Sequence, residues 1–319
     1  MRAYFSKSTR RRLSYLLFVI VLCIGFIDNR VPQKEAVQNP LLDTLHRSAN
    51  RSWELSREKR PHSNKILRNE TEYFSFLNKP SEFRCQKLIT LGGYSCRKYV
   101  DGNKEICLDE GVRPPMKNCL VYSFGVGNDA SFEGSLHSLY GCEIHMFDPT
   151  INASWVLEDI NGTNTHFHAR GLAAGDTVYQ IVSPNSTLNS YTYSTFGQIL
   201  RDNGHLGRTI HYLKMDIESG EWEALPNMID QGLLNNVLQI GMEIHANHLE
   251  HIPFSEWLPT LQKQYDILSR LEEIGFRKIS YRENFNMVGF LHLPFEKSGR
   301  PSCGEILYIR NPKKHQEIT

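Results

Sequence analysis

The sequence lacks the short motifs by which several enzyme classes are recognised. It contains no Gly-x-Ser-x-Gly elbow, no His-Glu-x-x-His pair, no Walker loop and no Cys-x-x-Cys pair. Hydrolase, metalloprotease, nucleoside triphosphatase and zinc-ribbon functions therefore have no support. The chain also lacks an excess of either charge, because 36 basic residues stand against 35 acidic ones. No electrostatic argument favours a nucleic acid, and none is expected as a partner.

What is present is a globular composition. Of the 319 residues, 40% are hydrophobic and 22% are charged, which is enough for a sizeable core. One α/β domain with an N-terminal extension is the organisation that this length favours. We expect a cytoplasmic basic tail (1–12), a transmembrane signal-anchor (13–27), a stem (28–80), a cysteine-containing β-rich lead-in (81–118), the main domain (119–312) and a tail (313–319).

The N-terminus predicts a membrane anchor. The apolar run Leu13–Ile27 follows a basic stretch that begins at Arg2. At 1.5 Å per residue the run spans roughly 22 Å, which suits a thin bilayer. Basic flanks stay cytoplasmic, so a single-pass type II protein with a domain in the Golgi or ER lumen is expected. The alternative is a cleaved signal peptide and a secreted protein, but Cys23-Ile24-Gly25 is a poor cleavage site.

Sequons and cysteines agree with a secretory location. Asn-x-Ser/Thr sequons begin at Asn50, Asn69, Asn152, Asn161 and Asn185. Six cysteines follow the apolar run and permit up to three disulfides. If Asp101-Gly102 forms a two-residue hairpin turn, counting outward places Cys96 opposite Cys107, within disulfide reach. Pairings with Cys85 or Cys119 remain the alternatives.

The chain is organised around one strand, turn and helix. The apolar run Leu120–Phe124 predicts a strand that stops at Gly125 and Gly127, and a helix is expected from 130 to 140 after Asp129. Glycines at such a turn let the backbone approach a ligand closely. This unit is typical of a doubly wound, Rossmann-like α/β fold.

Asp148 ends the second predicted strand, Glu143–Phe147, and lies 23 residues after Gly125. In nucleotide-binding sheets an acid at this position holds ribose hydroxyls, so an adenosine-type ligand is favoured. The alternative is an ordinary turn acid before Pro149.

Two more predicted strands end in polar residues. Tyr212–Met215 precedes Asp216, and the run 237–242 precedes Glu243 and His245. If these strands are parallel neighbours, the acids converge with Asp148 on one crevice. The other predicted elements are strands at 167–169, 178–182, 287–293 and 305–309, and helices at 195–201, 221–230 and 255–275.

Asp216, Glu243 and His245 are the candidate catalytic residues. A carboxylate or histidine there can act as a general base, and the three together would resemble a hard-metal cluster, although we assign no metal ligand from sequence. The alternative for Asp216 is an acid that stabilises the start of the next helix. The alternative for Glu243 and His245 is a solvated strand end. Lys214, inside a predicted strand, needs a partner if it is buried.

Three stretches carry a resemblance to a known family. They are Ser-Phe-Gly-Val-Gly-Asn-Asp at 123–129, Met-Phe-Asp-Pro-Thr at 146–150 and Tyr-Leu-Lys-Met-Asp-Ile-Glu-Ser-Gly-Glu-Trp at 212–222. Together with Gln-Ile-Gly-Met-Glu-Ile-His at 239–245, they resemble FkbM-type methyltransferases, and most closely the methyltransferase-like protein 24 group. The resemblance covers about residues 85–309. Relatives often carry Glu-Gly-Ala-Glu or Glu-x-Ser-Glu where this chain has Glu218-Ser219-Gly220-Glu221.

The resemblance implies a class I fold, whose seven-stranded sheet is mostly parallel with an antiparallel last strand, and S-adenosyl-L-methionine as cofactor. Phe124, Gly125 and Gly127 would line its methionine side, with Asp129 in the same turn. Asp148 would hold the ribose, and Asp216 would lie beside the sulfonium or the acceptor.

The favoured function is therefore a secretory-pathway methyltransferase acting on oxygen of an unknown glycan, lipid or small molecule. The alternatives are a Golgi glycosyltransferase that uses a nucleotide sugar, and a non-catalytic lumenal protein that keeps the fold.

Overall fold

A computed structural model describes residues 65–81, 83–93, 102–157, 160, 164–182, 188–285, 289–293 and 296–310. The predicted tail and anchor, residues 1–27, lie outside these ranges, as do Cys96 and most of the predicted stem. Within the ranges, no helix combines the length and apolar character needed to cross a membrane.

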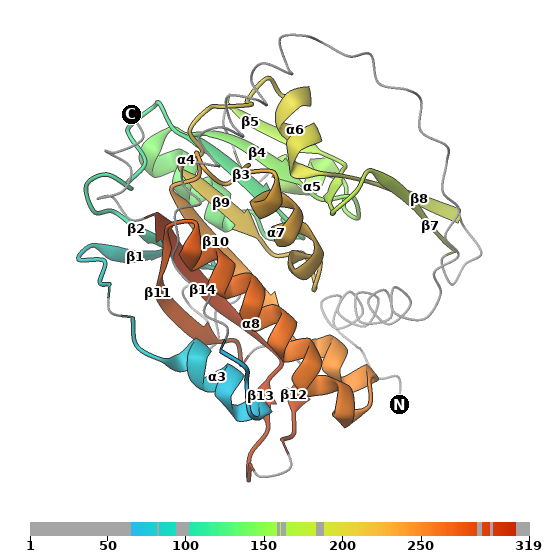
Figure 1. Ribbon diagram of the computed structural model, residues 1–319. Coiled ribbons are helices and arrows are strands. Elements are labelled where there is room, and N and C mark those ends of the chain that lie inside the picture. Colours follow the sequence, from blue (N-terminus) through green and yellow to red (C-terminus); the bar gives the residue numbers. More distant parts are fainter. Residues whose placement is uncertain are drawn as a thin grey trace, which may run out of the picture.

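A seven-stranded sheet forms the centre of the domain (Figure 1). Its strand order is β11-β14-β10-β9-β3-β4-β5. In chain order the strands are β3 (Leu120–Phe124), β4 (Glu143–Phe147), β5 (Thr165–His168), β9 (Tyr212–Met215), β10 (Gln239–His245), β11 (Phe276–Glu283) and β14 (Cys303–Arg310). Strands β5, β4, β3, β9 and β10 pair in parallel, and β14 is antiparallel to both of its neighbours. The predicted mostly parallel sheet with an antiparallel last strand is confirmed.

The order of the strands reverses beside β3. The chain runs from β3 outward through β4 to β5, and then returns to place β9 on the other side of β3. In open α/β sheets a ligand crevice forms at such a switch point, outside the carboxyl ends of the strands.

Two apolar cores cover the two faces of the sheet. Leu120, Tyr122 and Phe124 of β3 point into one core, and Val121 points into the other. This alternation follows from the two-residue period of a strand, and burial on both faces explains the continuous apolar run. The first core receives α3 (Glu70–Asn78), α6 (Phe196–Asp202), α7 (Glu221–Asp230) and α8 (Trp257–Glu273). The second receives α4 (Ser131–Tyr140) and α5 (Ala153–Leu157).

Smaller elements surround the sheet. A two-stranded sheet joins β1 (Leu88–Leu91) to β2 (Lys104–Cys107), and another joins β12 (Phe290–Leu291) to β13 (Arg300–Pro301). A three-stranded sheet contains β6 (Gly171–Leu172), β7 (Thr177–Val182) and β8 (Leu188–Ser194), and β7 and β8 extend away from the central sheet (Figure 1). Two short 3₁₀ turns, η1 (Asn247–His251) and η2 (Phe254–Glu256), precede α8.

The end of the predicted stem belongs to the folded domain. Helix α3 lies before residue 80, and its side chains Tyr73, Phe74 and Leu77 are buried in the first core. The folded domain therefore begins earlier than the predicted boundary.

One predicted closing strand is wrong. A strand was expected from Met287 to Leu293, but among the described residues there only Phe290–Leu291 is extended, in a small separate sheet. The edge strand is instead β11, whose sequence Phe-Arg-Lys-Ile-Ser-Tyr-Arg-Glu is half charged. Only two of its residues, Phe276 and Lys278, are fully buried, so the apolar pattern of a core strand is absent.

The predicted Cys96–Cys107 disulfide is also wrong. Cys107 is bonded to Cys85, and Cys119 is bonded to Cys142. The partner of β2 is β1, with Leu88 opposite Cys107. This register brings Cys85, just upstream of β1, to the end of β2. Cys303 is a free, buried thiol.

Candidate functional site

The carboxyl ends of four parallel strands lie in step. Phe124 pairs with both Phe147 and Met215, and Met215 pairs with Met242. Asp148, Asp216 and Glu243 therefore leave the sheet at one edge, as their positions at strand ends predict. Two groups form there: Asp148 contacts the glycine turn, and Asp216 joins Glu243 and His245, whose ligating atoms lie within 4.8 Å of one another.

The glycine turn needs glycine at both positions, for different reasons. Gly125 has φ +73°, and a Cβ added to it would lie 1.7 Å from the carbonyl oxygen of Asp216. Gly127 has φ +60°, but a Cβ there would meet no atom within 4 Å. Both torsions favour glycine. Gly125 is thus required by the close approach of β9, whereas Gly127 faces open space in which a ligand can approach the backbone.

Asp148 is buried and already engaged. Its Oδ2 accepts the backbone N–H of Gly127 at 2.9 Å, and its Oδ1 accepts the backbone N–H of Thr150 at 2.8 Å and the Thr150 hydroxyl at 2.7 Å. The contacts to Thr150 are those of a turn acid. A carboxylate has about four lone-pair sites, so Asp148 retains capacity for a further donor. The turn role and a ligand role are therefore compatible.

Phe124 and Asp129, both expected near the cofactor, have different surroundings. The ring of Phe124 is buried in the core and stacks on Phe147 with centroids 4.7 Å apart, so only its backbone is close to the glycine turn. Asp129 accepts the backbone N–H of Ser131, the first residue of α4, through Oδ1 at 2.9 Å.

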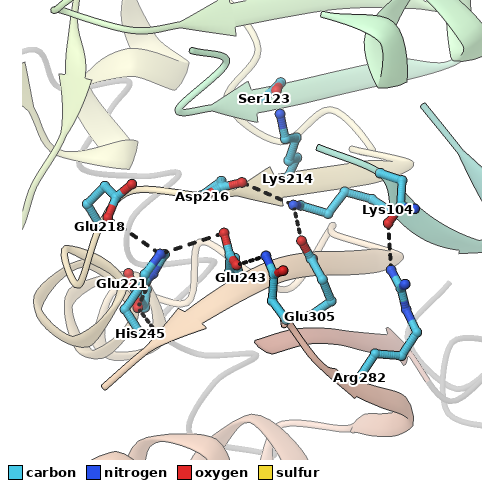
Figure 2. Close-up of polar contacts among 12 residues, drawn as sticks. Lys104, Ser123, Lys214, Asp216, Glu218, Glu221, Glu243, His245, Arg282 and Glu305 are labelled. Carbon is cyan, nitrogen blue, oxygen red and sulfur yellow. Dashed lines mark hydrogen bonds and ion pairs between the residues drawn. The ribbon is translucent and has the colours of Figure 1, made fainter. Parts of the chain in front are cut away.

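Lys104, on β2, forms an ion pair with Asp216, although the two residues are far apart in the sequence. Its Nζ lies 3.1 Å from Asp216 Oδ2 and 2.6 Å from Glu305 Oε1, and its side chain is 1% exposed (Figure 2). Burial raises the pKa of Asp216, but the charges of Lys104, Lys214 and His245 outweigh burial and hold that pKa well below its usual value. Asp216 is therefore ionised at physiological pH.

His245 is enclosed by carboxylates (Figure 2). Its Nδ1 lies 3.1 Å from Glu221 Oε1, and its backbone N–H donates to the same oxygen at 2.7 Å. Its Nε2 lies 3.6 Å from Glu218 Oε2 and 3.7 Å from Glu243 Oε2. Burial lowers the pKa of His245, but the charge and hydrogen bond of Glu221 outweigh burial and raise the pKa well above its usual value.

Glu243 differs in charge from its neighbour Asp216. Its Oε1 accepts a hydrogen bond from Asn284 Nδ2 at 2.7 Å. Burial, followed by the charge of Asp216, raises the pKa of Glu243 to about 8. Near neutral pH, one carboxyl of this pair is ionised and the other can hold a proton.

The turn after Asp216 adopts a backbone that non-glycine residues seldom adopt. Glu218 and Ser219 have φ angles of 54° and 78°. Left-handed backbone at non-glycine residues costs on the order of 1–3 kcal/mol each and clusters at functional sites. Here it places Glu218 beside His245.

The expected partner for Lys214 is present. Lys214 Nζ lies 3.0 Å from Glu133 Oε1 of α4, and the Ser123 hydroxyl donates to the same oxygen. This buried lysine thus forms its ion pair with a helix residue, and its charge also acts on Asp216.

Sequence reasoning missed several polar residues of the site. They are Lys104, Glu133, Glu221, Asn284 and Glu305, each contributed by a different element or loop. Glu305 adjoins the apolar run 306–309, and that position is a signal that could have drawn attention to it. Lys104 lies between Asn103 and Glu105 and gives no such signal.

The comparisons with known proteins agree on one family. A family model described as a methyltransferase domain matches residues 37–292. A human protein named "Probable methyltransferase-like protein 24" is 30% identical over 184 residues, which are 56% of this chain and 48% of that protein. The rat protein of the same name is 30% identical over 177 residues, which are 54% and 46%. The chain thus spans about half the length of the curated relatives it matches.

Solved structures share less. A fibrillarin pre-rRNA processing protein of Methanococcus jannaschii has a TM-score of 0.36 and 10% identity, covering 62% of this chain and 69% of that one. The plantazolicin methyltransferase BpumL, solved with SAH, has a TM-score of 0.30 and 10% identity, covering 60% and 76%.

Proposed function

The chain belongs to the family of methyltransferase domains, and we propose that it transfers a methyl group from S-adenosylmethionine to an oxygen of an acceptor in the secretory pathway. The observation that carries the proposal is the glycine turn at the switch point, bonded to Asp148 on one side and closed against Asp216 on the other. FkbM-type membership remains a prediction.

The residues present fit the cofactor. The space beside Gly127 would admit its methionine portion, next to the backbone of Phe124 and Gly125. Asp148 retains lone pairs for the ribose hydroxyls. Asp129 lies in the same turn and orders the start of α4. When bound, the cofactor supplies a methyl group on a sulfonium, and methyl transfer depends strongly on in-line positioning.

The acceptor hydroxyl would lie at the cluster of Asp216, Glu243 and His245. A hydroxyl acceptor must lose a proton, and the most effective base has a pKa near the working pH. Glu243 meets this condition, because burial and the charge of Asp216 raise its pKa to about 8. Asp216, paired with Lys104, would stay ionised beside the sulfonium, and His245 would orient Glu243 and carry positive charge.

Titration of the full chain tests the cofactor. Calorimetry with S-adenosylmethionine, and separately with nucleotide sugars plus manganese, distinguishes a methyltransferase from a glycosyltransferase. A library of released glycans, assayed for methyl turnover, then distinguishes an enzyme from a protein that only binds. Binding of a nucleotide sugar without binding of S-adenosylmethionine would exclude the proposed reaction.

The location is part of the proposal. The apolar run Leu13–Ile27 behind a basic flank favours a type II anchor. The disulfides Cys85–Cys107 and Cys119–Cys142 are typical of an oxidising compartment, and the sequon residues Asn69 and Asn152 are exposed. Glycosidase treatment of the protein expressed in animal cells should increase its mobility on a gel. An unchanged mobility with every sequon unmodified would argue against the lumen.

A further inference from the structure

We propose that Glu218, Glu243 and His245, with Asp216 beside them, bind one divalent first-row cation such as Mn²⁺ or Zn²⁺. The presence of this site does not depend on methyl transfer. Only its role toward an acceptor rests on the function proposed above.

The first observation is a buried ring nitrogen without a hydrogen bond. His245 is 1% exposed, and its Nε2 has no hydrogen-bond partner within the part of the chain that the structure describes. Its Nδ1 is held by Glu221, which is itself fully buried. A histidine ligand is typically oriented in this way, with a carboxylate on one ring nitrogen and the metal on the other.

The second observation is the spacing of the donor atoms. Nε2 lies 3.6 Å from Glu218 Oε2 and 3.7 Å from Glu243 Oε2, too far for hydrogen bonds. Two ligand atoms about 2.1 Å from one cation in tetrahedral geometry are roughly 3.4 Å apart. A cation between these atoms would therefore need only small side-chain movements. Asp216 can add an oxygen, because Asp216, Glu243 and His245 bring one ligating atom each within 4.8 Å of one another.

The third observation is the balance of charge. Five carboxyl groups meet here, namely those of Asp216, Glu218, Glu221, Glu243 and Glu305. Lys104 offsets Asp216 and Glu305 at one end of the group. At the other end His245 lies among the carboxylates of Glu218, Glu221 and Glu243. A buried excess of carboxylates is neutralised either by protons or by a cation.

Proton uptake and cation binding are therefore alternatives for the same groups. Asn284 holds Glu243 Oε1, and the other oxygen faces His245. A cation would replace protons on Glu243 and on His245 Nε2, since ligands must be deprotonated.

The donor set decides the class of cation. One imidazole nitrogen with carboxylate oxygens suits Mn²⁺ or Zn²⁺ better than Ca²⁺, which takes six to eight oxygens, or Mg²⁺, which keeps its waters. In a methyltransferase, the cation would bind the acceptor oxygen and lower the pKa of its hydroxyl. Glu243 would then be a ligand, and the proton that it receives in the metal-free reaction would pass to solvent water.

A second cluster provides a matched control. Glu143, His145 and His205 also bring three ligating atoms together. There, however, His145 bonds His168 at 3.0 Å and Glu143 at 3.1 Å, and the ring of His205 bonds the Tyr122 hydroxyl at 2.8 Å. The guanidinium of Arg208 lies 2.8 Å from Glu143. The rings of His145 and His205 thus already have hydrogen-bond partners, and Arg208 already supplies positive charge to Glu143. We therefore expect no metal ion to bind at this cluster.

The experiment uses the full chain, stripped with a chelator and titrated separately with MnCl₂ and ZnCl₂ by calorimetry, with electron paramagnetic resonance of bound Mn²⁺. We expect one equivalent to bind. Glu243→Gln and Glu218→Gln should each weaken binding at least tenfold, whereas His205→Gln should bind as the wild type does. Glu218 is partly exposed, so its substitution does not endanger folding even if that of Glu243 does.

Three results would overturn the site: no binding of either metal to the wild type, wild-type affinity in both glutamine variants, or loss of binding in His205→Gln. S-adenosylhomocysteine titrated into the same samples separates the two proposals. Its binding without metal binding overturns the metal site alone. Metal binding that follows the expected variants, without S-adenosylhomocysteine binding, supports the metal site and overturns the methyltransferase proposal.

Discussion

The carboxylate of Asp148 accepts the backbone N–H of Gly127 across 2.9 Å, so the tip of β4 holds the turn that follows β3. This contact joins the two features that predict an adenosine-type ligand into one structure. It also means that a change at Asp148 acts on the turn as well as on any ligand.

Replacing Asp148 by asparagine should weaken the binding of S-adenosylhomocysteine at least tenfold. Hydrogen bonds to a charged group contribute about 1.5–3 kcal/mol each, and the amide would present N–H groups where Gly127 and Thr150 already donate. Calorimetry measures the affinity. Thr150→Val is the control, because it removes one hydroxyl contact of Asp148 and keeps the charge. Equal affinity of Asp148→Asn and the wild type, both folded, would refute the ribose role.

Alanine at the two turn glycines should separate folding from binding. At Gly125 the new Cβ would lie 1.7 Å from the backbone of Asp216, so we expect a loss of at least about 3 kcal/mol in the free energy of unfolding. At Gly127 the Cβ meets no atom, and the left-handed backbone alone costs about 1–2 kcal/mol. Gly127→Ala should therefore fold and yet bind S-adenosylhomocysteine less tightly. Denaturant unfolding and calorimetry give the two readouts. Equal stability of the two variants would contradict the close approach of β9 to Gly125.

Peptide mapping without reduction should recover Cys85 linked to Cys107 and Cys119 linked to Cys142. The pairs are 22 and 23 residues apart in sequence, and closing loops of that size stabilises a fold by about 3 kcal/mol each. Cys85→Ser should lower the free energy of unfolding by this order. Cys303→Ser, which breaks no disulfide, is the comparison. A Cys107 peptide linked to Cys96 would restore the hairpin pairing that the sequence suggests.

Stability should fall as pH drops from about 6.5 to about 4. Burial lowers the pKa of His145 to about 4, against 6.5 in the unfolded chain, and burial likewise lowers the pKa of His168 to about 4. In this window the unfolded chain binds more protons than the folded one, so acid favours unfolding, whereas the full contribution is present above pH 6.5. The effect of His145 is about 3 kcal/mol.

Urea unfolding at pH 7 and pH 4.5 measures this loss. The difference in unfolding free energy between the two pH values should be smaller in His145→Gln than in the wild type. An equal difference in both proteins would show that other groups carry the acid sensitivity.

The sequence by itself determined the local helices and strands, and it showed which polar residues follow the ends of the strands. Strands 120–124, 143–147 and 212–215 and helix 221–230 begin and end where the apolar runs and turn residues predict. Such boundaries depend on neighbouring residues, on the two-residue period of strands and on glycine torsions. The acids at strand ends were visible for the same reason, since parallel strands place their carboxyl ends at one edge.

The tertiary structure alone decided which distant groups meet. The partners of buried charge, Lys104 with Asp216 and Lys214 with Glu133, lie 112 and 81 residues apart. The disulfide partner of Cys107 depended on the register between β1 and β2. Strand β11 joined the sheet, despite its charged sequence, because it pairs with the edge of β14. The sequence brings His245 into a candidate cluster, but only the fold places Glu221, 24 residues away, on one of its ring nitrogens. Contacts of this kind follow from packing and strand register, because a local stretch of sequence carries no record of what the fold will place beside it.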